Sequence, residues 1–342
     1  MESQDDIIRF ARKALGLSEA VPIQISPLEG RGSDRTFFRL KWNRGDSAIL
    51  IHYDPKRVEN AYYADIAVFL RDIKVPVPRL ILHDPTASLI LMEDVGDKDL
   101  YAFDKTPWET RRVLYQKTLA IIQKLHSFPE NNFPSTRVRL MEGFGQDLYK
   151  WERNYFKNHF VRDVCRIELD HSFEEKLEAE LSRLAEQLLA TKRCLVHRDL
   201  QSQNVMVRDG EPFLIDFQGM RFGNLFYDLG SLLYDPYVDL TSKQHEELLY
   251  FYYNLSSDLD WIVFENNFCE ASAQRLMQAL GAYGFLGLKK GLKTFLNHVP
   301  AGLRHLLDAT SRVTSLPLLH ELCLECEKTM QLRGNGSLTH LT

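Results

Sequence analysis

The sequence predicts an α+β fold of two lobes, in which a small antiparallel sheet with helices is followed by a larger, mostly helical lobe. Strand-like apolar runs are concentrated before residue 96, and beyond it apolar residues recur mainly at the three- and four-residue spacing of helices. The chain has 342 residues, more than one ordinary domain holds comfortably. We therefore expect a first lobe over residues 1–95 and a second over residues 96–342, with an active-site cleft between them.

Apolar spacing places the elements of the first lobe. Residues 7–15 carry apolar side chains on one helical face. Residues 23–40 have the pattern of two strands joined by a turn, and the turn contains Gly30, Gly32 and Ser33. Small residues there let backbone N–H groups approach phosphate oxygens, although the third glycine of a dinucleotide-binding fingerprint is missing. The other elements expected are a strand at 47–53, a helix at 58–70 and a buried strand at 88–96 that runs into a turn.

The second lobe is predicted to be helical apart from one hairpin. Residues 205–207 and 213–215 are apolar runs around Arg208-Asp209-Gly210-Glu211, and Asp-Gly between such runs is a strong turn signal. Six longer segments have apolar residues at helical spacing: 110–126, 173–189, 245–255, 273–286, 302–313 and 316–330.

A motif that can carry chemistry surrounds this hairpin. Residues 197–204 read His-Arg-Asp-Leu-Gln-Ser-Gln-Asn, and residues 215–217 read Ile-Asp-Phe. This order of Asp, Asn and second Asp is the layout of a kinase catalytic loop and its metal-binding Asp. We expect Asp199 to be the catalytic base that takes the proton of an attacking hydroxyl. Carboxylate and amide oxygens suit Mg²⁺, so we expect Asn204 and Asp216 to hold the magnesium ion that bridges the phosphates of ATP.

The first lobe departs from the usual kinase pattern at its third strand. Kinases place a phosphate-binding Lys on that strand and an acidic partner on the next helix. Segment 47–53 has no Lys, and its charged candidate is His52. Glu59 is the candidate acid of the helix. Arg35 or Lys56 could supply the missing positive charge, and the sequence does not choose between them.

The end of the segment 88–96 is the expected hinge between the lobes. Backbone groups from Glu93 to Val95 would hydrogen-bond the adenine, with Met92 near the ring. The residues expected to bind the nucleotide are therefore Gly30, Gly32, Ser33, Arg35, Glu59, Glu93 and Val95.

Composition narrows the class of protein. The net charge of −5 does not indicate a nucleic-acid partner, and no apolar run approaches the roughly 20 residues that span a bilayer. The acidic N-terminus does not resemble a signal peptide. The odd number of cysteines, 5, predicts free thiols in a reducing cytoplasm, including the lone Cys323-x-x-Cys326 pair. We expect a cytoplasmic enzyme without a membrane partner, and the sequence leaves open whether it is a monomer or a homodimer.

The catalytic segment carries a family resemblance. Residues 227–233 read Tyr-Asp-Leu-Gly-Ser-Leu-Leu, and together with the loop at 197–204 they resemble the aminoglycoside phosphotransferase and choline kinase superfamily. Only residues 218–226 separate them from Asp216, so the long peptide-docking segment of protein kinases is missing. The resemblance implies a bilobal protein-kinase-like fold, ATP and Mg²⁺, and a small hydroxylated acceptor.

Within the superfamily, the amino-acid sequence of residues 197–206 and 215–223 is similar to that of the bacterial kinases of cell-wall amino sugars. Residues 279–286, and a third strand without Lys, also resemble that group. The resemblance implies phosphorylation of the anomeric hydroxyl of N-acetylmuramate or N-acetylglucosamine in peptidoglycan recycling.

The resemblance also suggests roles for neighbouring residues. His197 and Arg198 are expected to brace the loop, and Asp228 is expected to anchor it by hydrogen bonds. Gln201 stands where protein kinases usually keep a Lys, and its role stays open. The candidates for the acceptor site, each more typical of packing when taken singly, are Trp151, Glu152, Arg221, Tyr234, Asp235 and Tyr237.

The sequence therefore predicts an ATP- and magnesium-dependent kinase of a small metabolite, with an amino sugar as the first choice. One alternative is another small-molecule kinase of the superfamily, acting on an aminoglycoside, choline or a similar amino alcohol. A strongly acidic acceptor pocket would favour it, because those substrates are cationic. The other alternative is a nucleotide-binding pseudokinase. The absent strand Lys motivates it, and the intact set of Asp199, Asn204 and Asp216 argues against it.

Overall fold

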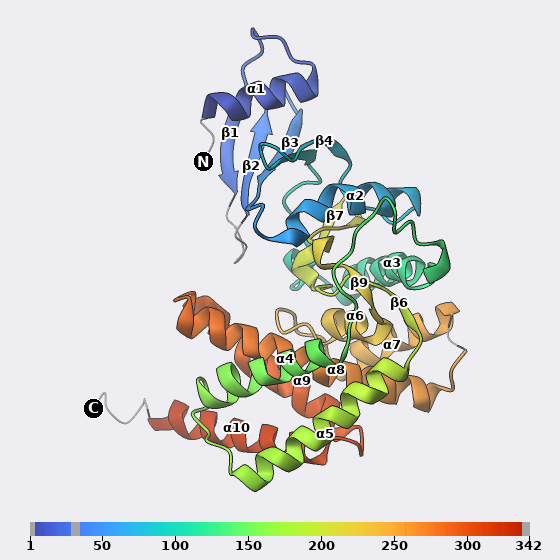
Figure 1. The fold of residues 1–342 in the computed structure, drawn as a ribbon, viewed down its shortest axis with the longest axis vertical. Coiled ribbons are helices and arrows are strands. Elements are labelled where there is room, and N and C mark those ends of the chain that lie inside the picture. The colour runs from blue at the N-terminus through green and yellow to red at the C-terminus, as the bar shows by residue number, and fades with distance from the viewer. Residues whose placement is uncertain (1–3, 29–34, 257, 337–342) are drawn as a thin grey trace.

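The sheet and most of the helices lie at opposite ends of the molecule (Figure 1). The structure is a computed structural model that describes residues 4–28, 35–256 and 258–336. At the N-terminal end, helix α1 (Gln4–Leu15) precedes five antiparallel strands in the order β1-β2-β3-β5-β4. The strands are β1 (Gln24–Leu28), β2 (Thr36–Lys41), β3 (Ser47–His52), β4 (Leu80–Asp84) and β5 (Leu89–Glu93), and helix α2 (Val58–Asp72) follows β3.

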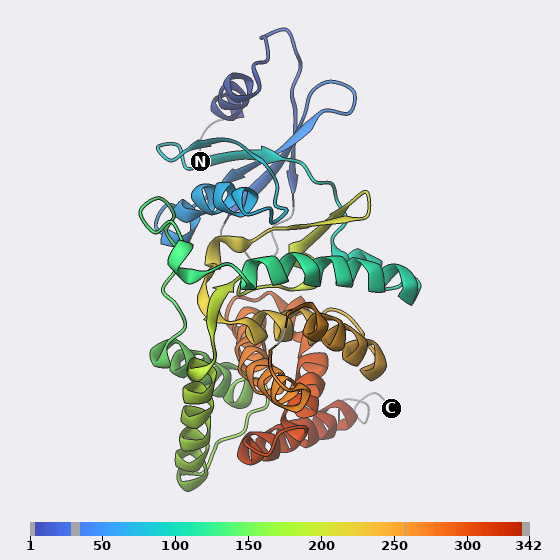
Figure 2. The same cartoon turned by 90° about the vertical axis from the view of Figure 1, so that its right-hand side faces the viewer.

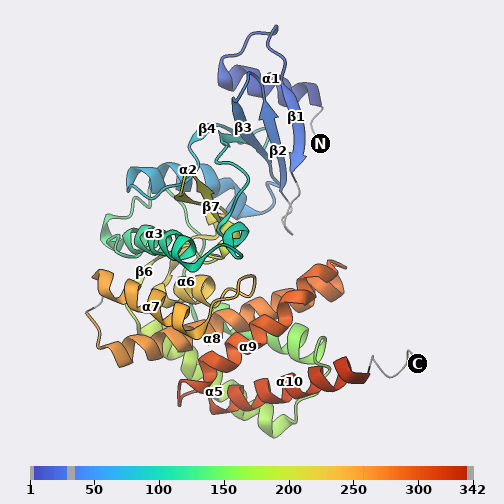
Figure 3. The same cartoon turned by 180° about the vertical axis from the view of Figure 1, so that it is seen from behind.

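The sheet has two covered faces because the four middle residues of the central strand β3, Ala48 to Ile51, are all apolar and buried. Successive side chains of a strand point to opposite faces. Ala48 and Leu50 pack with Ile7 of α1, whereas Ile49 and Ile51 belong to the larger core that includes α2. Figure 3 shows α1 lying across the strands and α2 on the side toward the helical lobe. The second face of the sheet therefore lies toward the rest of the protein.

The remainder of the chain is mainly helical, which confirms the predicted fold class. Its longer helices are α3 (Trp108–His126), α4 (Gln146–Phe156), α5 (His171–Ala190), α6 (Leu225–Leu233), α7 (Ser242–Ser256), α8 (Trp261–Gly284), α9 (Val299–Ser311) and α10 (Pro317–Gly336). Two short antiparallel pairs lie among them. They are β6 (Arg193–Val196) with β9 (Arg221–Asn224), and β7 (Val205–Arg208) with β8 (Glu211–Leu214).

The β7–β8 hairpin connects the two ends of the molecule. In Figure 2 it lies, in yellow, between α2 and α3. The backbone N–H of Leu214 donates to Pro76 O of the first lobe at 2.9 Å, and that of Val207 donates to Lys98 O, just beyond the boundary, at 2.7 Å. Arg208 forms an ion pair with Glu93 at 2.8 Å. We keep the boundary between residues 95 and 96 as our proposal, since the sheet ends at Glu93.

Some elements were not predicted, for physical reasons. Helix α6 is buried from Phe226 to Leu233, and even its polar residues Asp228 and Ser231 are enclosed, so its sequence lacks the solvent-facing polar side that marks most helices. Gly230 of α6 lies so close to α8 that a Cβ there would come within 2.6 Å of Ser272 Oγ. Strand β4 is a five-residue edge strand without a fully buried side chain, which gives only a weak pattern.

Within the described ranges, no helix combines the length and the apolar composition that crossing a membrane requires. Cys323 and Cys326 are buried thiols in α10 and are not joined in a disulfide.

Candidate active site

The start of the catalytic loop is held by hydrogen bonds to a buried carboxylate. Asp228, at 0% exposure in α6, accepts hydrogen bonds from the backbone N–H of His197 at 2.6 Å and of Arg198 at 2.8 Å. His126 of α3 contacts the same carboxylate at 3.1 Å. These bonds hold Arg198 in the left-handed conformation, with φ of 78°. Asp228 thus occupies the anchoring position that the sequence suggests.

A second carboxylate holds the other end of the loop. Asp235 accepts hydrogen bonds from the backbone N–H of Ser202 at 2.7 Å and of Tyr237 at 3.0 Å. Burial raises the pKa of Asp235 to about 6, and the hydrogen bonds from Ser202 act in the opposite direction. The loop therefore has a fixed shape before any ligand binds.

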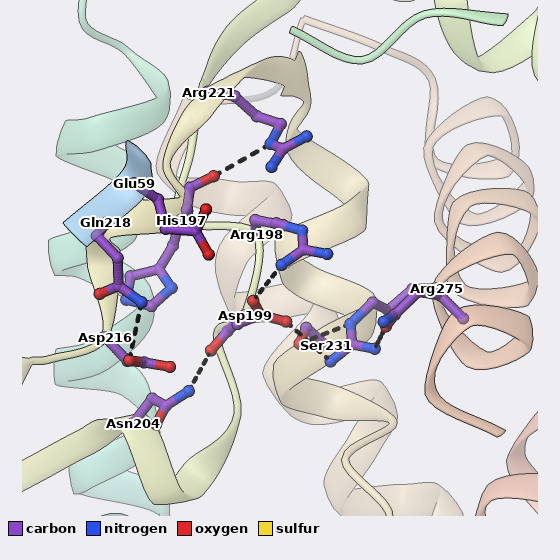
Figure 4. A network of polar contacts seen from close by, with 12 residues as sticks. Glu59, His197, Arg198, Asp199, Asn204, Asp216, Gln218, Arg221, Ser231 and Arg275 are labelled. Carbon is purple, nitrogen blue, oxygen red and sulfur yellow. Dashed lines mark hydrogen bonds and ion pairs between the residues drawn. The ribbon is translucent and has the colours of Figure 1, made fainter. Parts of the chain in front are cut away.

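The three residues of the predicted catalytic set converge. The Asn204 amide donates to the backbone oxygen of Asp199 at 2.8 Å, and the Ile215 N–H donates to the backbone oxygen of Asn204 at 3.0 Å. His197 Nε2 bonds Ile215 O at 2.9 Å. These bonds bring the Asp216 segment beside the loop, and Figure 4 shows the side chains of Asn204 and Asp216 next to each other near Asp199.

The donor chemistry of Asn204 and Asp216 suits magnesium. No cluster of three His, Cys, Asp or Glu side chains able to hold a metal exists in the part of the chain that the structure describes. Mg²⁺ is commonly held by only one or two carboxylates, with water and substrate phosphates completing its shell, so a single Asp and an amide oxygen are a sufficient protein contribution. Asp216 adopts φ 63°, and the Gln218 amide donates to its Oδ1 at 3.0 Å. Arg35 also forms an ion pair with Asp216.

A cavity of about 220 Å³ lies beside Asp216, between the sheet and the catalytic loop. Its lining brings together the predicted residues Arg35, Glu93, Val95, Asn204 and Asp216. The other lining residues are Leu28, Phe37, Arg39, Ile49, Ile51, Tyr63, Met92, Asp94, Gly96, Gln203, Met206 and Ile215.

The hinge borders this cavity with an unpaired backbone N–H group. The N–H of Val95, a residue 5% exposed, has no hydrogen-bond partner among the residues described. The side chain of Glu93 is turned to Arg208 and to the Arg79 N–H, at 2.8 and 3.0 Å. A free N–H beside an apolar wall can donate a hydrogen bond to the edge of a flat heterocycle whose face packs on that wall. Any contact of Glu93 with such a ring would therefore come from its backbone.

Other expected nucleotide contacts do not reach the cavity. Glu59 is absent from its lining, and its carboxylate lies 3.8 Å from Arg57. Lys56 is exposed and His52 is half-buried, whereas Arg35 lines the cavity. The geometry thus favours Arg35 over Lys56 as the cation nearest Asp216. Gly30, Gly32 and Ser33 lie outside the described residues.

Arginines surround the predicted base. Arg198 lies 2.8 Å from Asp199 Oδ2, and Arg275 of α8 lies 3.6 Å from Oδ1 (Figure 4). Burial alone would raise the pKa of Asp199, but the charges of Arg198 and Arg275 outweigh it and hold the pKa below its usual value. With 28% of its side chain exposed, Asp199 is an ionised acceptor that a hydroxyl group can reach.

Two basic residues of this site were missed from the sequence. Arg275 is 4% exposed and bonds Ser231 Oγ at 3.1 Å. Arg39 of β2 lines the cavity and bonds Asp94 at 3.0 Å. The only sequence signal for either was a charge placed within an otherwise apolar pattern, which identifies a buried ion pair but not its partner.

Most of the acceptor candidates have internal partners. Glu152 is fully buried and bonds Tyr227 and Gln274 at 2.8 and 2.9 Å, and burial raises its pKa. Tyr234 bonds Asp308. Trp151 is 50% exposed and stacks on Tyr155, with ring centroids 4.8 Å apart.

We expect Asp228→Ala to destabilise the fold by about 3 kcal/mol, because two buried N–H groups of the loop lose their acceptor. Turnover should also fall, since Asp199 is placed by that loop. Urea denaturation and steady-state kinetics measure the two effects. Asp170→Ala is the matched control, because Asp170 also accepts from two backbone N–H groups, at 2.9 and 3.3 Å, but is exposed. It should cost only about 1 kcal/mol and leave turnover unchanged. Equal losses in the two variants would contradict the anchoring role.

Comparison with known proteins agrees with this geometry. Residues 24–261 match the model of a family described as the phosphotransferase enzyme family. The N-acetylmuramate/N-acetylglucosamine kinase of Pseudomonas aeruginosa is 24% identical over 321 residues, which cover 90% of each chain.

Solved structures share the fold. The choline kinase LicA from Streptococcus pneumoniae superposes with a TM-score of 0.60 at 16% identity, covering 89% of this chain and 99% of that one. The ADP-bound aminoglycoside phosphotransferase APH(2'')-Ib gives a TM-score of 0.57 at 14% identity, covering 90% and 99%. At these identities the likeness concerns the fold alone.

Proposed function

Because this chain belongs to the phosphotransferase enzyme family and is a small-molecule kinase, we propose that it transfers the γ-phosphate of ATP to the anomeric hydroxyl of a cell-wall amino sugar. The observation that supports phosphoryl transfer is the convergence of Asp199, Asn204 and Asp216 beside one cavity. The names of the relatives, N-acetylmuramate/N-acetylglucosamine kinase, support the acceptor. We place the reaction in the cytoplasm, where the free thiols stay reduced.

In this proposal Asp199 orients the acceptor. Its low pKa makes it a weak base, so it accepts a hydrogen bond from the sugar hydroxyl and takes the proton as the bond to phosphorus forms. Asn204 and Asp216 hold Mg²⁺, which offsets the charge of the ATP phosphates. Val95 N–H and the apolar wall with Met92 hold the adenine. Arg35 supplies a positive charge near the phosphates, as the strand Lys does in other kinases.

The charges near Asp199 weigh against a cationic acceptor. Arg198 and Arg275 lie within 2.8 and 3.6 Å of its carboxylate, and Arg221 also acts on its pKa. Aminoglycosides and choline carry positive charge, and like charges brought together in a partly buried site cost free energy. An amino sugar with an acetylated nitrogen avoids this repulsion.

Turnover of ATP on a panel of acceptors tests the proposal. The panel contains N-acetylglucosamine, N-acetylmuramate, kanamycin and choline, and formation of ADP is measured with Mg²⁺ present. We expect kcat/KM for at least one N-acetylated sugar to exceed that of the cationic acceptors by about a hundredfold. Preference for a cationic acceptor would support the alternative kinase, and nucleotide binding without turnover would support the pseudokinase.

A further inference from the structure

Arg221 is a buried cation without an anionic partner among the residues that the structure describes. It is 7% exposed at the start of β9. Its Nε donates to Gly219 O at 3.1 Å, and its guanidinium lies over the Phe144 ring, 5.4 Å from the centroid. No described carboxylate forms an ion pair with it, and its two terminal nitrogens have no hydrogen-bond partner among the residues that the structure describes. Those nitrogens are not fully enclosed.

The neighbouring charges compensate this cation only in part. Burial and the charge of Arg198 lower the pKa of Arg221, and they outweigh the opposite effect of Asp199 and Glu152. Asp199 is already shared by Arg198 and Arg275. The carboxyl group of Glu152 is turned to Tyr227 and Gln274, and burial raises its pKa. Leaving a buried charge unpaired is costly, so the site favours a ligand that brings an anion.

The position of Arg221 relates this anion to the reacting hydroxyl. Gly219, which accepts from Arg221, is so close to the base that a Cβ added to it would lie 3.9 Å from Asp199 Oδ2 and 3.5 Å from Arg198 Cδ. A guanidinium can bind a carboxylate through two parallel hydrogen bonds. Such a carboxylate would lie on the same molecule as the hydroxyl that Asp199 orients.

We propose that Arg221 binds a carboxylate of the acceptor, so that this kinase prefers an acidic amino sugar over a neutral one. The inference rests on the proposed function and specifies its substrate class. Figure 4 shows Asn204 and Asp216 on one side of Asp199, with Arg221 beyond Arg198. The nucleotide cavity is lined by Arg35 and Arg39 but not by Arg221, so an acceptor carboxylate fits this position better than an ATP phosphate does.

A matched pair of acceptors tests the inference. N-acetylmuramate is N-acetylglucosamine with an added lactyl ether that carries a carboxylate. We expect the wild type to have the higher kcat/KM for N-acetylmuramate. Arg221→Met should lower the ratio of the two kcat/KM values by about tenfold, mainly through KM for the acidic sugar, and Arg221→Lys should restore part of it. Thermal melting checks that each variant is folded.

Arg193→Met is the control variant. Arg193 also lies over a phenylalanine ring, 5.6 Å from the centroid of Phe222, but it is 54% exposed at its side chain and paired with Glu130. The acceptor ratio should not change in this variant. A wild type without preference for the acidic sugar would overturn the inference. So would an Arg221→Met variant that loses turnover equally on both sugars while KM for ATP rises, because the anion would then be a phosphate.

Calorimetric titration with N-acetylmuramate separates this inference from the proposed function. If neither sugar is phosphorylated, the proposed function fails, yet the acidic sugar should still bind the wild type about tenfold more tightly than it binds Arg221→Met. Absence of that difference would overturn the role of Arg221.

Discussion

Replacing Asp199 by Asn should lower kcat by about a thousandfold while the fold and the affinity for ATP stay close to those of the wild type. The amide has nearly the same shape as the carboxylate, but it cannot accept the proton of the sugar hydroxyl. It also removes the charge that Arg198 and Arg275 now share at 2.8 and 3.6 Å. Steady-state kinetics give kcat, and calorimetric titration with a nonhydrolysable ATP analogue gives the affinity.

The control for this change is Asp209→Asn, which makes the same substitution in the exposed turn between β7 and β8. Asp209 has φ of 54°, a conformation that Asn also adopts easily. Its kcat should equal that of the wild type. If Asp199→Asn kept more than a tenth of the wild-type kcat, another group would have to be the base.

Replacing Asp216 by Asn should remove the effect of magnesium on nucleotide binding. In the wild type, ADP should bind more tightly with Mg²⁺ than with EDTA, because we propose that Asn204 and Asp216 supply oxygen ligands to the metal. In Asp216→Asn the two affinities should become nearly equal, and turnover should fall by about a thousandfold. Calorimetric titration of ADP in the two buffers measures the difference directly.

Asp97→Asn is the matched control for this change. Asp97 is a carboxylate near the cavity, paired with Arg39, but its side chain is 76% exposed and does not line the cavity. Magnesium should affect ADP binding to this variant as it does in the wild type. If instead Asp97→Asn abolished the magnesium effect and Asp216→Asn kept it, the metal site would lie elsewhere.

The sequence predicted what depends on local patterns. The catalytic loop and the hairpin between Asn204 and Asp216 are contiguous, so spacing and turn residues were enough to bring these side chains together. The elements of the first lobe, apart from β4, also followed from alternation and helical period. Strand β3, for example, runs from Ser47 to His52, one residue shorter than predicted.

Partners far apart in the chain could not be predicted in this way. Arg275 meets Asp199 only because α8 packs against α6, and Asp235 reaches Ser202 only because α6 ends beneath the loop. A single sequence gives the charge of such residues but not their partner. The same limit applied to the replacement of the missing strand Lys. From the sequence, Arg35 and Lys56 were equally good candidates, and the structure favours Arg35 because it lines the cavity and Lys56 does not.

The positive charge around Asp199 also could not be predicted from the sequence. Arg198, Arg221 and Arg275 come from a loop, a strand and a helix, and no single motif includes all three. The chain as a whole carries a net charge of −5, so composition suggested no local positive charge. Only the folded arrangement shows arginines concentrated around Asp199, and that arrangement separates an acidic or neutral acceptor from a cationic one.

The most direct test of phosphoryl transfer to a sugar hydroxyl oriented by Asp199 is the ³¹P NMR spectrum of the products formed from ATP, Mg²⁺ and each N-acetylated sugar. We predict one new phosphate monoester, coupled to the anomeric proton, in equal amount to ADP and absent with Asp199→Asn. A product phosphorylated at another oxygen, or ADP accompanied only by free phosphate, would contradict the account.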